Sequence, residues 1–314
     1  MAAIVTQDLV KVFGGVRAVD GLNLTVAEGT VFGFLGPNGA GKTTTIRMLT
    51  GMAVPTAGNA EVAGVRLGVD GAVRAKVGYL PEEPAFYPWM NPLEFLDHVG
   101  RLFGLDPATR KERANRLLEQ VGLTYVAKRR IGGFSRGMRQ RLGLAQALIN
   151  QPGVLFLDEP VSALDPAGRK EVLDLIDGLR GKCTIFMSTH ILADVERVCD
   201  TVGIIDRGRL VEEANQAELL KRYTVPAFEV ECESGSEELF TAWLQHLGQL
   251  NWVVSIQPEG NSARVVVNDM NLARMSFLSE AAGAHLPLRR YEVVTPSLED
   301  VFLRLVSESH GKTS

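Results

Sequence analysis

The sequence predicts an α/β fold built around a phosphate-binding loop, followed by a smaller domain that mixes helices and strands. The first observation is a glycine-rich loop that fits the pattern G-x-x-x-x-G-K-[ST]. The second is its setting, because a buried-strand pattern at residues 30–35 precedes the loop and a helical pattern at 44–49 follows it. The third is a change of composition near residue 223, after which strands and helices alternate without a catalytic motif.

Length and composition limit the classes of protein to consider. The chain has 314 residues, enough for about two domains, and its formal net charge of −4 argues against a general nucleic-acid-binding surface. Three separated cysteines fit a reducing compartment better than a disulfide framework or a zinc site. We expect no signal peptide, and no apolar run is long enough to cross a bilayer. A role at a membrane is therefore expected to act through a partner.

The glycine-rich loop is expected to bind phosphate through nine consecutive residues: Gly36, Pro37, Asn38, Gly39, Ala40, Gly41, Lys42, Thr43 and Thr44. Its glycines let successive N–H groups point inward at a helix N-terminus and form an anion nest. We expect Lys42 to reach the β- and γ-phosphates and the Thr43 hydroxyl to ligate Mg²⁺. The alternative, a chance glycine-rich turn, is disfavoured by the complete motif and its flanks.

Two antiparallel strands, at residues 4–6 and 22–26, are predicted before the loop. Phe13 lies between them. Taken alone it fits a core position, but a flat ring beside a nucleotide site can also stack on adenine.

Two acidic residues, Glu82 and Glu83, follow a predicted strand at residues 77–81. Acids that leave a strand near a triphosphate can contact Mg²⁺ or its waters, and the alternative is a solvated acidic turn. A helical segment, about residues 86–150, comes next and opens with the aromatic residues Phe86, Tyr87 and Trp89. These rings either form an interface or pack beneath the helices.

Three further positions point to nucleotide chemistry. Ser135 is predicted to cap a helix N-terminus, which is a second place for a phosphate. Asp158 ends an apolar strand and is expected to hold Mg²⁺, while Glu159 is expected to orient or deprotonate a water. The alternative is an edge strand that runs into a polar loop. His190 follows a strand at residues 184–189, where it is placed to contact a γ-phosphate.

Taken together and in this order, the motifs resemble the nucleotide-binding subunit of an ATP-binding cassette (ABC) transporter over roughly residues 2–222. The phosphate loop is similar to Walker A, residues 155–158 with Glu159 to Walker B and its catalytic glutamate, and residues 134–138 to the LSGGQ signature. The resemblance implies that Phe13 is the adenine-stacking aromatic, that residues 162–165 form the D-loop and that His190 is the switch histidine.

The resemblance includes departures from the family pattern. Glu82 stands where the family usually has the Q-loop glutamine, Arg136 and Met138 replace glycine and glutamine in the signature, and Ala163 replaces glycine in the D-loop. Ser135 and Gly137 of the signature remain. The residue types of this signature resemble those of the bacterial exporters whose ATPase is a separate chain, the type-2 exporter subgroup.

The resemblance implies an ATPase with ATP and Mg²⁺ as cofactors, which powers export through a separate transmembrane permease subunit. It also implies that the chain forms a homodimer or pairs with a second ATPase subunit, and that nucleic acid is not a partner. The chain is expected to be cytoplasmic and peripheral on the cytoplasmic face of the membrane. Each ATP would lie between Walker A of one chain and residues 135–137 of the other. The alternatives are an importer ATPase, a simple phosphate-loop kinase and a cytosolic ABC protein that acts on the ribosome or on DNA.

We predict two domains. Residues 1–222 form the P-loop ABC ATPase cassette, with antiparallel β and α-helical subdomains. Residues 223–314 form an accessory domain whose order β-α-β-β-α-β suggests a ferredoxin-like α+β fold. Pro226 is the expected linker point, and Ser297 is expected to cap a final helix.

Overall fold

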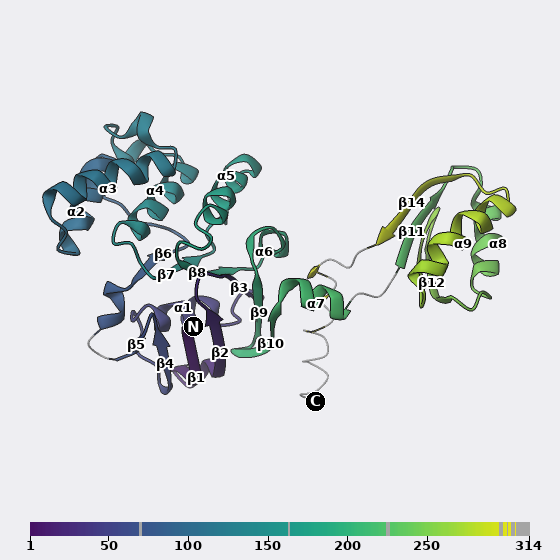
Figure 1. Ribbon diagram of the computed structural model, residues 1–314, viewed down its shortest axis with the longest axis horizontal. Helices are drawn as coiled ribbons and strands as arrows, with labels where there is room; N and C mark the ends of the chain where they lie inside the picture. Colours follow the sequence, from purple (N-terminus) through teal and green to yellow (C-terminus); the bar gives the residue numbers. More distant parts are fainter. Residues whose placement is uncertain are drawn as a thin grey trace. The chain divides into compact units, whose positions relative to one another are not determined.

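The computed structural model describes residues 1–68, 71–162, 164–223, 227–294, 298–299, 301–302 and 305 (Figure 1). They fall into two compact units, Met1–Ala217 with the described part of Phe302–Ser314, and Glu218–Val301. The expectations for Ala163, Pro226 and Ser297 lie outside the described residues. The domain boundary at 222/223 stays a prediction. No helix in the described part of the chain is long and apolar enough to cross a membrane.

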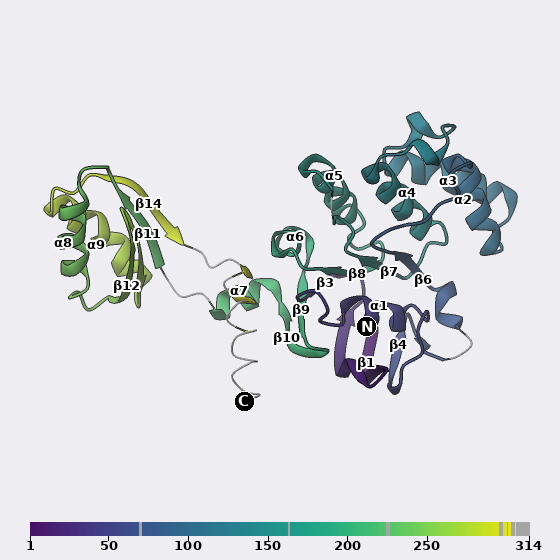
Figure 2. The same ribbon diagram turned by 180° about the vertical axis from the view of Figure 1, so that it is seen from behind.

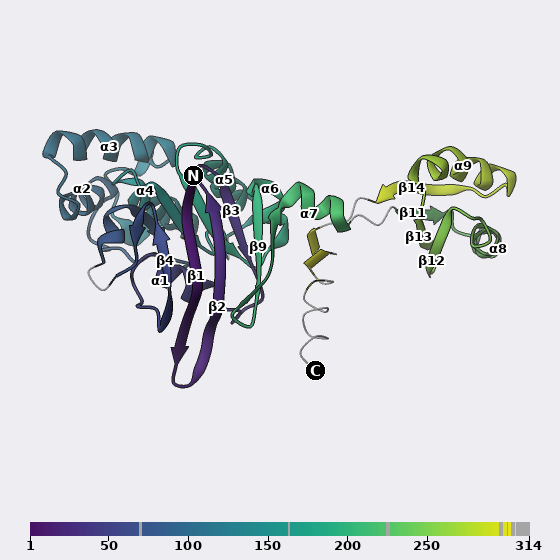
Figure 3. The ribbon, with the colours of Figure 1, turned by 60° about the horizontal axis from the view of Figure 1, so that its bottom comes forward.

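A four-stranded antiparallel sheet opens the first unit, with the strand order β2-β1-β4-β5. Its strands are β1 (Ala2–Phe13), β2 (Val16–Ala27), β4 (Ala57–Val62) and β5 (Val65–Arg66). The strands β1 and β2 form one long hairpin, seen in Figure 3, that closes where Phe13 pairs with Val16. Both strands are much longer than the sequence predicts, because their pairing continues through polar and exposed positions as far as the turn.

The six-stranded sheet carries the phosphate loop and has the strand order β10-β9-β3-β8-β7-β6. Its strands are β3 (Val31–Leu35), β6 (Val77–Leu80), β7 (Val154–Asp158), β8 (Thr184–Thr189), β9 (Thr201–Asp206) and β10 (Arg209–Asn215). All neighbours are parallel except β10, which pairs antiparallel with β9. The strands β3, β8 and β7 are buried along their whole length, as expected for the centre of a parallel sheet.

Seven helices and three 3₁₀ turns lie within the described residues from 1 to 223, and the last helix, α7, crosses the boundary between the two units. The helices are α1 (Lys42–Leu49), α2 (Pro92–Leu102), α3 (Pro107–Gln120), α4 (Arg136–Leu148), α5 (Pro166–Asp177), α6 (Leu192–Val198) and α7 (Gln216–Tyr223). The 3₁₀ turns are η1 (Ala72–Ala75), η2 (Thr124–Val126) and η3 (Ile131–Gly133).

The helices α2, α3 and α4 form a cluster of their own beside strand β6 (Figures 1 and 2). Each begins at a side-chain cap: Asn91 forms a capping box with Glu94, and Asp106 and Ser135 cap the next two helices. A separate core of buried residues between positions 95 and 149 holds the cluster together.

Four phenylalanine rings form the centre of the sheet's core. Phe186 of β8 stacks on Phe32 with ring centroids 5.3 Å apart, and lies 5.1 Å from Phe34 and 5.5 Å from Phe156. All four side chains are fully buried. Their packing fixes β3, β7 and β8 against one another beneath the loops that follow these strands.

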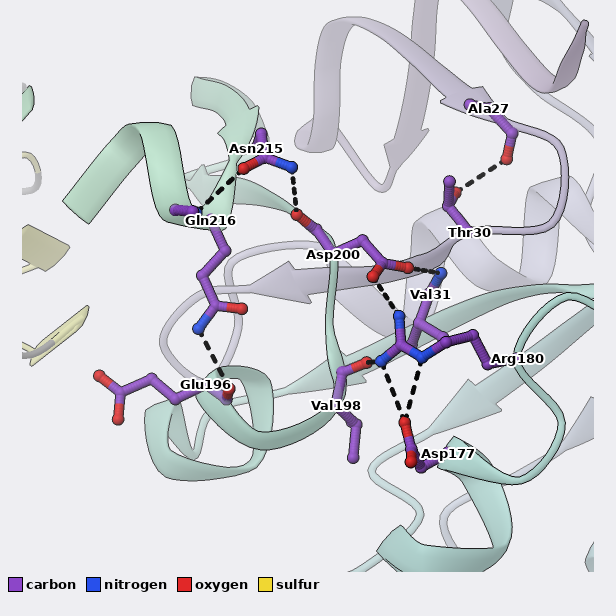
Figure 4. A network of polar contacts seen from close by, with 11 residues as sticks. Ala27, Thr30, Val31, Asp177, Arg180, Glu196, Val198, Asp200, Asn215 and Gln216 are labelled. Atoms are coloured by element: carbon purple, nitrogen blue, oxygen red, sulfur yellow. Dashed lines mark hydrogen bonds and ion pairs between the residues drawn. The ribbon is translucent and has the colours of Figure 1, made fainter. Parts of the chain in front are cut away.

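Asp200 ties together the opposite end of the sheet, at the amino ends of β3 and β9 (Figure 4). One carboxylate oxygen accepts from the backbone N–H of Val31 at 2.8 Å, and the other accepts from Arg180. Arg180 also donates to Asp177 and to the carbonyl of Val198 at 2.8 Å. The start of β3, the end of α5 and the start of β9 are thus joined through one carboxylate and one guanidinium.

The second unit has the predicted order β-α-β-β-α-β. Its elements are β11 (Ala227–Cys232), α8 (Glu237–Leu247), β12 (Val253–Glu259), β13 (Ser262–Val267), α9 (Met270–Gly283) and β14 (Leu288–Val294). The sheet order β12-β13-β11-β14, antiparallel throughout, is that of a ferredoxin-like fold. Trp243, Trp252 and Phe277 are buried in its core.

We predict that Phe186→Ala lowers the free energy of unfolding of the first unit by about 3–5 kcal/mol, because it leaves a cavity among three other rings. Urea denaturation followed by circular dichroism measures the change. Phe103→Ala is the control, since that ring is 39% exposed, and we expect it to cost less than about 1 kcal/mol. Equal losses in the two variants would contradict the assigned role of the ring cluster.

Candidate functional site

The phosphate loop connects β3 to α1 and depends on two glycines that approach other backbone atoms closely. A Cβ at Gly36 would lie 2.3 Å from the carbonyl oxygen of Ile205, and one at Gly41 would lie 2.4 Å from that of Ala18. Gly41 also has φ +108°, a conformation that side chains rarely adopt. The strand-loop-helix context is therefore held by close backbone packing that only glycine permits.

The start of α1 offers free hydrogen-bond donors. In the described part of the chain, the backbone N–H groups of Lys42, Thr43 and Thr44 have no acceptor within the protein. The first turn of α1 contains no acidic residue. A helix N-terminus with unpaired N–H groups and a positive dipole end favours a bound anion.

Lys42 lies on the loop with its side chain 6% exposed. Its ammonium donates to the carbonyl oxygens of Gly36 at 2.7 Å and Pro37 at 3.2 Å, and it is 3.5 Å from a carboxylate oxygen of Glu159. A buried ammonium needs such partners, because an uncompensated charge away from water is costly. The same group can exchange these carbonyls for phosphate oxygens.

Asp158, at the end of β7, is surrounded by hydroxyl groups. Its Oδ1 accepts from Ser188 Oγ at 2.6 Å and from Thr43 Oγ1 at 3.1 Å. The structure thus brings together Thr43 and Asp158, two of the three residues predicted to hold Mg²⁺. Sequence reasoning missed Ser188, although the parallel register places it directly opposite Asp158. A hydroxyl at the end of the strand neighbouring Walker B was the available signal.

Glu159 occupies the left-handed region of backbone space, with φ 47°. Its backbone N–H is shared between the carbonyl and hydroxyl oxygens of Ser188, at 3.1 and 3.2 Å. Its carboxylate lies 2.9 Å from Nδ1 of His190. A non-glycine residue with positive φ costs free energy, and the contacts with Ser188 and His190 hold this geometry in place.

One open cleft of about 440 Å³ collects most of the predicted site residues. It is lined by Ala18, Asn38, Gly39, Gly41, Lys42, Thr43, Thr44, Glu82, Glu159 and His190. Ala18 is a lining residue that sequence reasoning did not identify, since nothing in its side chain indicates a ligand. Phe13 is not among the lining residues; its ring is 53% exposed and lies 4.9 Å from the ammonium of Lys11.

The donors around Asp158 fit a hard divalent cation. Thr43 and Asp158 supply oxygen atoms, and Glu82 lines the same cleft as Thr43. Oxygen is the donor that Mg²⁺ prefers. Among the described residues no group of three or more His, Cys, Asp or Glu side chains is placed to hold a metal. Phosphate oxygens and waters would therefore complete the coordination of Mg²⁺ here.

Tyr79 of β6 lies close to the same carboxylate. Burial, reinforced by the negative charge of Asp158, raises the pKa of its phenol to about 12. The phenol therefore keeps its proton throughout the neutral range. It can donate a hydrogen bond but cannot act as a general base.

Ser135 and Gly137 do not line this cleft. They stand at the N-terminus of α4, where Ser135 Oγ accepts from the backbone N–H of Met138 at 3.2 Å. Within one chain, the structure does not bring these two signature residues to the phosphate loop.

A larger cleft of about 640 Å³ lies in the second unit, along strands β11, β12, β13 and β14. Three of its charged side chains are in ion pairs: Arg290 bonds Glu292 and lies 3.7 Å from Glu229, and Glu231 lies 3.0 Å from Arg289. The phosphate loop instead combines free backbone N–H groups with a buried lysine and carboxylates, and we therefore place the candidate site there.

Two family profiles match the chain. The profile described as ABC transporter matches residues 19–162, and the profile described as the C-terminal domain of DrrA1-3-like ATP-binding proteins matches residues 215–306.

Similar curated proteins include an uncharacterized ABC transporter ATP-binding protein, YxlF of Bacillus subtilis, 41% identical over 96% of this chain and 98% of that one. The bacitracin transport ATP-binding protein BcrA of Bacillus licheniformis is 43% identical over 70% of this chain and 72% of its own. The daunorubicin resistance ATP-binding protein DrrA3 of Streptomyces coeruleorubidus is 35% identical over 98% and 96%.

Solved structures agree in fold. An ATP-binding subunit of an ABC transporter is 29% identical, with a TM-score of 0.64 over 70% of this chain and 93% of that one. A dimeric post-hydrolysis structure of an ATP-binding cassette, bound to ADP and Pi, has a TM-score of 0.61 over 68% and 98%, at 23% identity.

We predict that Ser188→Ala slows nucleotide hydrolysis about tenfold to a hundredfold, because Asp158 loses a charge-assisted hydrogen bond. It should also raise the Mg²⁺ concentration needed for half-maximal rate. Phosphate release measured across a Mg²⁺ titration tests both effects. Thr6→Ala is the control, since it removes a buried hydroxyl that donates to Leu22 far from the loop. Wild-type kinetics in Ser188→Ala would show that Asp158 does not depend on this contact.

Proposed function

The chain belongs to the ATP-binding proteins of ABC transporters, and from that premise we propose that it powers export through a separate transmembrane permease. The relatives support export: they include proteins named for bacitracin transport, daunorubicin resistance and Nod factor export. They do not favour the alternative of a cytosolic ABC protein acting on the ribosome or on DNA. The single observation that carries the proposal is the convergence of the phosphate loop, Asp158, Glu159 and His190 at one edge of the sheet.

In this proposal ATP lies along the phosphate loop with its phosphates on the N-terminus of α1. Lys42 leaves the carbonyl oxygens of Gly36 and Pro37 for the β- and γ-phosphates. Phe13, exposed at the end of β1, stacks on the adenine ring. The free N–H groups at the start of α1 donate hydrogen bonds to the remaining phosphate oxygens.

The metal and water roles follow from the hydroxyl and carboxylate contacts. Thr43, Asp158 and Glu82 would hold Mg²⁺, which when bound neutralises the phosphate charge. Glu159 orients the attacking water and accepts its proton. His190, 2.9 Å from Glu159, holds that carboxylate and faces the γ-phosphate. Lys42 and His190 both keep Glu159 oriented while the nucleotide is absent.

A second copy of the chain, or a related ATPase subunit, completes each site by pairing head to tail. The open cleft of one chain would face Ser135 and Gly137 of the other. In support, Ser135 is exposed, and among the described residues the backbone N–H groups of Arg136 and Gly137 have no acceptor in their own chain. Closure around ATP then assembles the catalytic groups, and hydrolysis reopens the pair.

The permease would hold the chain on the cytoplasmic face of the membrane, and we propose that Tyr87 and Trp89 contact it. The structure divides the aromatic residues of this segment. Phe86 packs edge-on against Phe95 of α2, with centroids 5.0 Å apart, whereas Tyr87 and Trp89 are 43% and 63% exposed. Their rings lie 5.3 Å apart. Paired exposed rings are typical of interfaces, and this pair begins five residues after Glu82.

We predict that Glu159→Gln binds ATP, hydrolyses it at less than about one hundredth of the wild-type rate and accumulates as an ATP-bound dimer, because it loses the proton acceptor and keeps the site's shape. Size-exclusion chromatography with light scattering, with and without ATP, measures the dimer. Glu171→Gln is the control, as an exposed glutamate in the same unit. Hydrolysis at the wild-type rate in Glu159→Gln would remove the proposed role.

We predict that a photo-crosslinking residue at position 87 forms a covalent product with an integral membrane protein in cells that express the transporter. Membrane fractionation followed by mass spectrometry identifies the product. The control is position 125, where Tyr125 is 75% exposed on the same helical cluster but is remote in sequence from Glu82. Crosslinking at 125 and none at 87 would assign the permease contact to a different surface.

A further inference from the structure

The first turn of α4 carries an unfavourable pattern of charge. Arg136 and Arg139 are both exposed there, and the turn contains no acidic residue. The N-terminus of a helix is already the positive end of its dipole, so cations at this end lower the stability of the free chain. An anion brought to this turn would relieve the repulsion.

Unused donors surround the same turn. The side chain of Gln140, only 3% exposed, has an amide nitrogen with no hydrogen-bond partner among the described residues. Gln140 lines a cleft of about 280 Å³ together with Glu82, Glu83, Pro84, Arg136 and Arg139. Unpaired buried donors are rare, and this one adds to the free N–H groups of Arg136 and Gly137.

Glu83 is the ion-pair partner of Arg136 in the free chain. The guanidinium Nη2 of Arg136 lies 3.7 Å from Glu83 Oε1, and the two side chains are 48% and 84% exposed. Such exposed and loosely aligned pairs contribute little to stability. A phosphate group, with more charge and a geometry that suits a bidentate guanidinium, competes well for the same arginine.

We propose that Arg136 contacts the terminal phosphate of the ATP bound by the second copy, and that Glu83 holds the same guanidinium in the free chain. This inference rests on the head-to-tail pairing described under the proposed function. It goes beyond that pairing, because Arg136 is one of the two residues that depart from the family signature, and it is the one that adds a charge. The replaced glycine could supply only a backbone N–H, whereas Arg136 adds a full positive charge.

The test measures the ATP concentration for half-maximal dimer formation in a Glu159→Gln background. Adding Arg136→Ala should raise this concentration about tenfold, the effect of removing one charge-assisted contact. Adding Glu83→Gln should lower it severalfold, since the competitor is gone. The combination Glu83→Gln with Arg136→Ala should match Arg136→Ala alone, because Glu83 acts only through that arginine.

Matched controls separate this effect from general surface charge. Arg116→Ala and Glu112→Gln remove an ion pair of 3.9 Å whose side chains are 49% and 73% exposed on α3. Neither should change the midpoint. Arg136→Lys, which keeps the charge but loses the bidentate fork, should fall between wild type and Arg136→Ala. Circular dichroism establishes that each variant is folded.

Two results would overturn the inference while leaving the proposed function intact. The first is a folded Arg136→Ala or Arg136→Lys protein that dimerises at the unchanged ATP concentration. The second is additivity of the Glu83 and Arg136 changes, which would make them independent. Failure of Glu159→Gln itself to dimerise with ATP would instead count against the head-to-tail arrangement.

Discussion

The parallel alignment of β3, β8 and β7 is the constraint on which the site depends. Because the three strands run in the same direction and in register, Leu35 pairs with Thr189 and Asp158 with Ser188. The phosphate loop, the acidic pair at 158–159 and the histidine at 190 all leave the sheet at this one edge. Segments far apart in sequence thereby meet without any of them having to fold back across the sheet.

Two sets of contacts keep this edge of the sheet rigid. Beneath the loops, the four packed phenylalanine rings keep the strands from sliding. At the amino ends, Asp200 and Arg180 join β3, β9 and the end of α5. The positive φ of Glu159 persists because such a frame over-determines it. A glutamate on a less constrained loop would relax toward ordinary backbone angles.

Sequence reasoning predicted the fold class and most residues of the cleft, because phosphate recognition imposes a fixed spacing of glycine, lysine and threonine. It missed Ser188, whose importance arises only from strand pairing. The sequence did not decide whether the aromatic residues that follow Glu82 form an interface or pack beneath the helices. In the structure Phe86 packs against Phe95, whereas Tyr87 and Trp89 are exposed. Sequence reasoning also ended β1 too early and began β2 too late, since hairpin pairing through polar positions leaves a weak periodic signal.

The distribution of tryptophan provides the protein with an optical reporter of its own. The chain has three tryptophans, and Trp243 and Trp252 are enclosed in the core of the second unit at 2% and 5% exposure. Trp89, at 63%, is the one that a dissolved quencher such as iodide can reach. The quenchable part of the emission therefore comes from the loop that follows Glu82. A partner that covers Trp89 would protect its fluorescence from iodide. The loss of quenching would therefore report binding at this surface in real time, on unlabelled and unmutated protein.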